Sequence, residues 1–213
     1  MKKNSIFIII GFIILIVLIF LISLGTHKKS KKKHYAAVNK SLLNAALLYG
    51  KKNANLNSYE FSKPWTINLG YKDGKGYAIL CTPFLRLALL KNEAVQNKEK
   101  LSNSFENNIY QQEIGIIHFL VTMYGNSPKF SKRIKAFLIY NKKIIKPTFI
   151  YFPLYGEMGL NYTQISNGEI KFPRGNIPNN AIVTLIVKIE PNPSDKWEKS
   201  HTAKFKFNLA KYR

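Results

Sequence analysis

The longest run of apolar positions lies near the N-terminus. No charged residue occurs between Lys3 and His27. A helix over residues 5–25 would be about 31 Å long at ~1.5 Å per residue, which matches the ~30 Å hydrocarbon core of a bilayer. We therefore predict that residues 1–34 form a single-pass transmembrane anchor with a basic flank. The positions expected to contact membrane lipid along this helix are Ile6, Ile10, Ile14, Leu18 and Ile22.

A cleavable signal peptide is the alternative for this segment. Ser23 and Gly25 place small residues at the spacing that signal peptidases prefer. The apolar core is longer than that of a typical signal peptide, however, and lysines directly after a cleavage point would hinder translocation. The length of the core therefore favours an uncleaved signal anchor.

The lysines around the apolar run bear on which side of the membrane the rest of the chain occupies. Five of them follow the run: Lys28, Lys29, Lys31, Lys32 and Lys33. Counted strictly, the positive-inside rule places this side in the cytoplasm. A short basic N-terminus followed by a long apolar core is also how many exported bacterial proteins begin, and on that basis we predict an extracytoplasmic domain. The five lysines are candidates for contact with anionic lipid or polymer, at ~1 kcal/mol each, or they are a solvated stop signal.

Helical spacing of apolar residues recurs in three further segments. Residues 35–52 show it, so residues 35–58 are predicted to be a helical stalk or linker, and the polar residues 53–63 are a linker or the edge of the domain. The best helix covers residues 82–98, where Thr82 is a suitable cap and Pro83 suits the first turn. Helical spacing then continues to Ile109 with a break near Ser102.

Strand patterns dominate the remainder of the chain. Residues 65–81 predict a hairpin, because Asp73 and Gly74 supply turn chemistry between two strand-like runs. Further strands are predicted at 114–123, 134–140, 144–152, 165–172, 182–189 and 203–209. Pro147 makes the third of these an edge or bent strand. The fold class is therefore α+β: residues 59–213 form a domain dominated by an antiparallel, immunoglobulin-like β-sandwich over 113–213.

The net charge of +22 raises the question of a nucleic-acid partner. Seven of the 33 basic residues precede Tyr35, which leaves 26 against 11 acidic residues in the rest of the chain. Only four of the basic residues are arginines, although arginine is better suited to bidentate phosphate and guanine contacts. The many lysines also accompany a general excess of Asn, Ile, Phe and Tyr, which is typical of an AT-rich genome. Nucleic acid is therefore the less favoured partner.

Candidate chemistry is sparse. The four histidines, His27, His34, His118 and His201, have no Cys, His or carboxylate at ligand spacing, so neither a metal nor a cofactor is predicted. The single cysteine, Cys81, excludes an intrachain disulfide. It lies at the end of a strand beside a helix N-terminus, so a thiol nucleophile with His118 as its partner is one hypothesis, and a buried apolar side chain is the other. No hydrolase, zinc-protease or P-loop motif supports an enzyme.

One loop is a candidate binding surface. The segment PLYGEMGLNYTQ carries Tyr155, Met158 and Tyr162 between two predicted strands. Aromatic and methionine side chains in a loop at the end of a sandwich can form an interface, or they can pack within the loop.

Two regions are similar to a known group of proteins. The stretches TPFLRLALLKNEA (82–94), VTMYGNSPKF (121–130) and KAFLIYNKKIIKP (135–147) resemble a pattern in uncharacterised bacterial proteins that begin with a signal or a membrane anchor. The resemblance covers residues 78–147 and implies an exported domain, with no catalytic residues to carry over.

Together these features predict a single-pass membrane protein that presents an extracytoplasmic, β-rich interaction domain to a protein or cell-envelope partner. The alternative is a basic, membrane-tethered protein that binds nucleic acid or another anionic polymer.

Overall fold

The computed structural model describes residues 39–159, 163–194 and 200–212. The chain divides into two compact units, residues 1–36 and 37–213, and all of the described residues belong to the second unit. The predicted membrane anchor and its lysine flank lie outside the described residues. In the part of the chain that is described, no helix is both long enough and apolar enough to cross a membrane.

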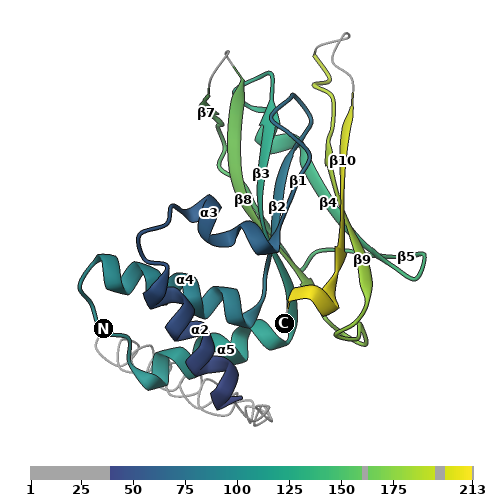
Figure 1. The fold of residues 1–213 in the computed structure, drawn as a ribbon. Helices are drawn as coiled ribbons and strands as arrows, with labels where there is room; N and C mark the ends of the chain where they lie inside the picture. Colours follow the sequence, from purple (N-terminus) through teal and green to yellow (C-terminus); the bar gives the residue numbers. More distant parts are fainter. Residues whose placement is uncertain (1–38, 160–162, 195–199, 213) are drawn as a thin grey trace, which may run out of the picture. The chain divides into compact units, whose positions relative to one another are not determined.

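Four α-helices form one side of the described unit (Figure 1). They are α2 (Lys40–Lys52), α3 (Ser58–Ser62), α4 (Pro83–Gln96) and α5 (Asn103–Ile114). The caps follow the sequence: the hydroxyl of Thr82 accepts a hydrogen bond from the amide of Leu85 at 3.2 Å, and Ser102 caps α5 in the same way. The predicted helix over 82–98 and the break near Ser102 are therefore confirmed, although α4 ends at Gln96.

The polar segment 53–63 was expected to be a linker or the edge of the domain, and its second half packs against the helices. It contains α3, whose Phe61 is only 1% exposed and packs edge-on against Tyr49 with the ring centroids 5.1 Å apart. A helix of five residues is too short to produce a repeating apolar pattern, so only the tertiary packing of Phe61 identifies it.

Six strands form the first sheet, all in antiparallel pairs. They are β1 (Thr66–Asn68), β2 (Gly76–Cys81), β3 (Ile116–Gly125), β6 (Phe149–Tyr151), β7 (Glu157–Met158) and β8 (Gln164–Pro173). The order is β1-β2-β3-β8-β6, and β7 pairs with β8 beside β6. The predicted hairpin is confirmed as β1 and β2. Strand β3 begins two residues later than predicted because α5 continues to Ile114.

Four strands form the second sheet, in the order β10-β9-β4-β5. They are β4 (Ile134–Tyr140), β5 (Lys143–Ile145), β9 (Ile182–Ile189) and β10 (His201–Asn208). The turn between β4 and β5 places Asn141 and Lys142 at φ angles of 47° and 64°, as a two-residue hairpin turn requires. The described residues also contain short 3₁₀ segments, η1 (Lys63–Trp65), η2 (Phe130–Arg133) and η4 (Leu209–Tyr212).

Pro147 divides a segment that the sequence predicted as one edge or bent strand over 144–152. The residues before it form β5 at the edge of the second sheet, and those after it form β6 at the edge of the first. Proline cannot donate a ladder hydrogen bond, so the chain leaves one sheet there and joins the other.

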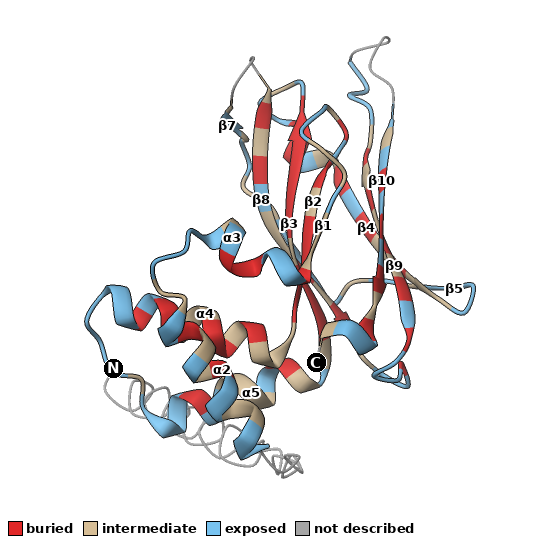
Figure 2. Ribbon diagram, in the orientation of Figure 1, coloured by how far each residue is buried: buried red, intermediate tan, exposed pale blue. Residues whose placement is uncertain are grey.

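The two sheets enclose a common hydrophobic core (Figure 2). Strand β10 supplies it by strict alternation: Ala203, Phe205 and Phe207 are buried, and Lys204 and Lys206 are exposed. Strands β2, β3 and β8 of the first sheet supply residues such as Phe119 and Phe172 to the same core.

The helices cover the opposite face of the first sheet. A second hydrophobic cluster joins Ala46 of α2 and Leu85 of α4 to Ile79 of β2, with Leu120 of β3 packed against it. The first sheet is therefore covered on both faces at β2 and β3. The predicted α+β class, with antiparallel sheets, is confirmed.

Candidate functional site

Two residues that the sequence analysis paired as a hypothesis, Cys81 and His118, lie directly opposite one another. Cys81 ends β2, His118 lies in β3, and the two are partners in the antiparallel ladder. Their chain neighbours Leu80, Ile117 and Phe119 point into the core between the sheets. Because side chains alternate along a strand, both Cys81 and His118 project from the helix-covered face of the first sheet.

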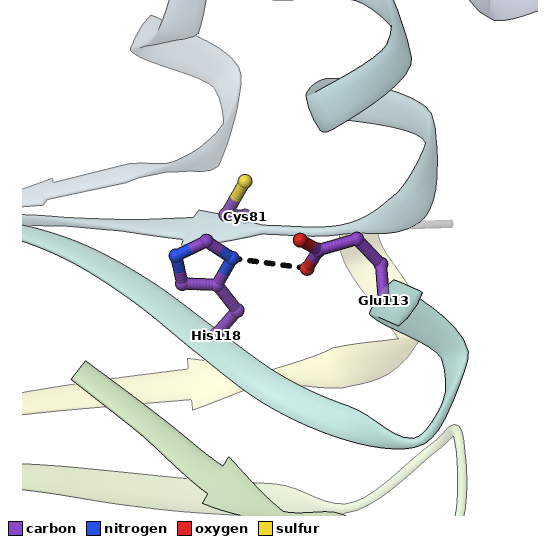
Figure 3. A group of neighbouring side chains, drawn as sticks. All are labelled: Cys81, Glu113 and His118. Atoms are coloured by element: carbon purple, nitrogen blue, oxygen red, sulfur yellow. Dashed lines mark hydrogen bonds and ion pairs between the residues drawn. The ribbon is translucent and has the colours of Figure 1, made fainter. Parts of the chain in front are cut away.

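A third side chain, Glu113, reaches the same point from the last turn of α5 (Figure 3). One carboxylate oxygen of Glu113 lies 2.9 Å from Nδ1 of His118. One ligand atom from each of Cys81, Glu113 and His118 lies within 4.8 Å of the other two. All three residues are buried, with exposed fractions of 3%, 6% and 1%. We refer to these three residues as the thiol–imidazole–carboxylate cluster.

A second carboxylate approaches the other side of the imidazole. Oε1 of Glu169, on β8, lies 2.8 Å from Nε2 of His118 and 2.8 Å from Nζ of Lys171. The short distance does not amount to a hydrogen bond, because the alignment at Nε2 is poor and the atom is left without a proper partner. Glu169 and Lys171 are both about one-third exposed, so they form the boundary between the cluster and solvent.

The pKa values of two ionisable groups beside His118, Cys81 and Glu169, shift in opposite directions. Desolvation, reinforced by the charge of Glu113, raises the pKa of the Cys81 thiol far above its usual value. Desolvation also acts to raise the pKa of Glu169, but the hydrogen bond from Lys171 and the positive charges of His118, Lys171 and Arg86 outweigh it, and the net pKa is lowered. At neutral pH the Cys81 thiol is therefore protonated, and the carboxylate of Glu169 beside the cluster is ionised.

This state does not suit a thiol nucleophile. The reactive species is the thiolate, which needs an electropositive and partly exposed environment. Cys81 has neither, although the histidine that the hypothesis required lies beside it. The arrangement is better suited to holding a positively charged group than to attacking a substrate.

Sequence reasoning missed both carboxylates. Glu113 precedes His118 by five residues, but its approach depends on a helix that ends at Ile114 and a strand that starts at Ile116. Glu169 comes close only through the pairing of β8 with β3. The proximity of Glu113 to the start of a predicted strand was the one available signal.

The predicted binding loop lies at the free edge of the first sheet. Tyr155 is 56% exposed and Met158 is 73% exposed, and Tyr162 lies outside the described residues. The neighbouring strand β6 is exposed along its whole length. We call the exposed apolar residues of this edge the edge strip: Phe149, Ile150, Tyr151, Leu154, Tyr155 and Met158.

Phe152, between the two parts of the edge strip, packs against the core and over β8. A Cβ atom on Gly168 of β8 would overlap the ring of Phe152, so the glycine leaves the space that this ring fills. Two lysines approach the strip from its borders: Nζ of Lys171 lies 5.2 Å from the ring centre of Phe149, and Nζ of Lys132 lies 5.6 Å from that of Tyr155. The strip is thus an ordered apolar surface with positive charge at its border.

The outer face of the second sheet carries a group of lysines. Strands β4, β9 and β10 contain no acidic residue, and their lysines alternate with core residues and face outward. We call this group the lysine face: Lys135, Lys188, Lys204 and Lys206. Lys135 and Lys188 are ladder partners, and Lys135 also forms an ion pair with Glu190 at 2.7 Å.

No protein-family model, no curated protein and no solved structure matches the chain.

Cys81 should react slowly with a thiol reagent while the protein is folded. We expect its modification by Ellman's reagent, with a chelator present, to be at least about 100-fold slower than in urea, because the thiol is buried and protonated. A Thr202→Cys variant provides an exposed control site. If Cys81 reacts in the folded protein as fast as Cys introduced at position 202, the buried thiol is contradicted and the nucleophile hypothesis regains support.

Proposed function

We propose that this protein is a single-pass membrane protein whose β-rich domain lies outside the cytoplasmic membrane and binds a partner protein through the edge strip. The observation that carries the proposal is the exposure of six large apolar residues together on one sheet edge. The apolar N-terminal run supports the anchor by its length. The boundary between the two compact units falls directly after the basic flank, at Ala36–Ala37.

The edge strip has the composition of an interface. Soluble proteins usually protect an edge strand with charge, proline or a covering segment, because its free backbone groups can pair with another chain. Among the described strands, β6 and β7 pair only with β8. Pro147 and Pro153 limit the length of this edge without covering it. Tyrosine, phenylalanine and methionine are the residue types enriched at protein interfaces.

The mode of binding that suits this edge is addition of a strand. An extended segment of a partner would pair with the backbone of β6, and its side chains would contact the flanking aromatic residues. Lys171 and Lys132 at the border of the strip would favour a partner segment with acidic residues beside its apolar ones.

We also propose an immunoglobulin-like architecture for the two-sheet part of the domain. Two features support it: both sheets are antiparallel, and the chain passes from one sheet to the other between β5 and β6. The helices α4 and α5 would then be an insertion between the neighbouring strands β2 and β3.

The orientation can be tested with single introduced cysteines, because the native Cys81 is buried and provides a silent background. With a membrane-impermeant maleimide, we expect Thr202→Cys to be labelled in intact bacterial cells and Asn4→Cys only after lysis. Thr202 is exposed on β10, and Asn4 precedes the apolar run. Labelling of Thr202→Cys only after lysis would contradict the extracytoplasmic domain.

The edge strip can be tested by site-specific photocrosslinking in cells. A photoreactive amino acid at Tyr151 should give discrete protein adducts, whereas one at Ile182 should not. The two positions are a matched pair, since they are 57% and 52% exposed but lie on different sheets. Adding Met158→Asp should lower the adduct yield about tenfold, which corresponds to ~1.4 kcal/mol of binding free energy. The same adducts from both positions would contradict a role for the strip.

A second candidate function is favoured by the lysine face. Four outward lysines without an acidic residue in the same strands are suited to a polyanion such as single-stranded nucleic acid. The neighbouring half-buried Phe137 and Ile186 would add apolar contact.

This alternative predicts a steep dependence of oligonucleotide affinity on salt. Replacing Lys188, Lys204 and Lys206 by Gln should reduce the slope of log K against log[salt] by about 2, at ~0.7 per phosphate contact. Replacing Lys51, Lys52 and Lys100 removes the same charge from exposed positions elsewhere and should change the slope much less. Equal effects of the two sets, or no binding at low salt, would end the polyanion hypothesis.

A further inference from the structure

We propose that the thiol–imidazole–carboxylate cluster binds one divalent metal ion of the zinc class, with Cys81, Glu113 and His118 as its ligands. This inference is independent of the proposed partner binding. It begins from the donor set, since thiolate sulfur, imidazole nitrogen and carboxylate oxygen are the three ligand types that zinc takes from proteins. All three come from different elements, β2, α5 and β3, and converge at one point (Figure 3).

The spacing of these groups is close to what an ion needs. Zinc bonds of about 2.0–2.3 Å in a tetrahedral arrangement place neighbouring ligand atoms roughly 3.3–3.8 Å apart. One donor atom from each residue lies within 4.8 Å of the others, and Nδ1 of His118 is 2.9 Å from Oε2 of Glu113. A small opening of this hydrogen bond and a small approach of the sulfur are sufficient. The three donors are positioned by two paired strands and a helix end.

The surroundings of His118 provide the second, independent observation. Its Nε2 atom is fully buried and lacks an aligned hydrogen-bond partner, yet it faces the carboxylate of Glu169 at 2.8 Å. A histidine that binds zinc typically donates its other N–H to a carboxylate, which fixes the tautomer and strengthens the ligand. With the ion on Nδ1, the proton belongs on Nε2, and Glu169, already 2.8 Å away, would accept it after a small change of alignment. Lys171 holds Glu169 in place.

The charge balance of the cluster also suits an ion. Binding would release the thiol proton of Cys81 and displace the proton on Nδ1 of His118, so a divalent cation takes the place of one or two protons. The two carboxylates, Glu113 and Glu169, place negative charge on either side of the imidazole, which favours a cation at this point. The partly exposed pair of Glu169 and Lys171 offers a route from solvent.

The expected consequence is mechanical. An ion at this point would tie the end of α5 to β2 and β3, and so fasten the helical layer to the first sheet. A metal that binds the folded chain but not the unfolded chain stabilises the fold by mass action. The melting temperature should therefore rise with the concentration of free zinc.

Cobalt(II) titration of the full-length protein, purified in detergent under reducing conditions, tests the proposal. We expect one ion per chain, with visible bands of a tetrahedral site and a sulfur-to-cobalt charge-transfer band. Since Cys81 is the only cysteine, that band reports this site alone. Zinc should displace the cobalt, and zinc addition in weak buffer should release roughly one to two protons per ion.

Three variants sharpen the test. Cys81→Ser should abolish the sulfur band, and Glu169→Gln, which alters only a positioning residue, should weaken cobalt affinity about 10-fold while the band remains. His201→Asn is the matched control, because His201 also faces a carboxylate, Asp73 at 3.2 Å, but lies near the surface. It should bind cobalt like the unaltered protein.

Two results would overturn the proposal: no cobalt binding at up to about 100 μM free metal, or binding without a sulfur band, which would assign the ion to other histidines. If the Cys81→Ser variant does not fold, the sulfur-to-cobalt band and the proton release of the unaltered protein still test the proposal.

Discussion

The burial of strand β3 on both faces is the constraint on which the rest of the structure depends. One face of β3 packs against the second sheet, and the other lies beneath the helices. A strand in this position is expected to be apolar throughout, yet it contains His118. A buried imidazole needs polar neighbours: its hydrogen-bond partner, Glu113, comes from the helix that immediately precedes the strand, and a second carboxylate, Glu169, comes from the strand beside it. The polar cluster is therefore a consequence of the two-sided burial of this sheet.

The same arrangement determines which surfaces remain available. The helices cover the first sheet at β2 and β3, and β6 and β7 remain exposed at its edge. The second sheet has no helical cover among the described residues, so its outer face is solvated and its alternate positions carry lysines. An apolar edge and a basic face thus lie on different sheets, which is why each can be altered without the other.

Much of the fold could be predicted from the sequence. The bounds of β4 and β9 agree with the prediction to the residue, because two-residue alternation in an amphipathic strand is a local signal. The cap of α4 was recognisable for the same reason, since Thr82 and Pro83 act on the adjacent turn. The loop containing Tyr155 and Met158 was identified as a candidate surface, but the contribution of β6 to it was not. Its exposure depends on the division of one predicted strand at Pro147.

The sequence by itself determined the α+β class and most strand positions, because these depend on patterns between near neighbours. It also paired Cys81 with His118 as a hypothesis, because the chain has one cysteine and few histidines. Only the tertiary structure decided that Glu113 and Glu169 meet the same imidazole, that α3 belongs to the core, and that the edge strip is one surface. Those features depend on how strands pair and how helices pack over a sheet. These long-range contacts are fixed by the packing of the whole core, and no local spacing of residues encodes them.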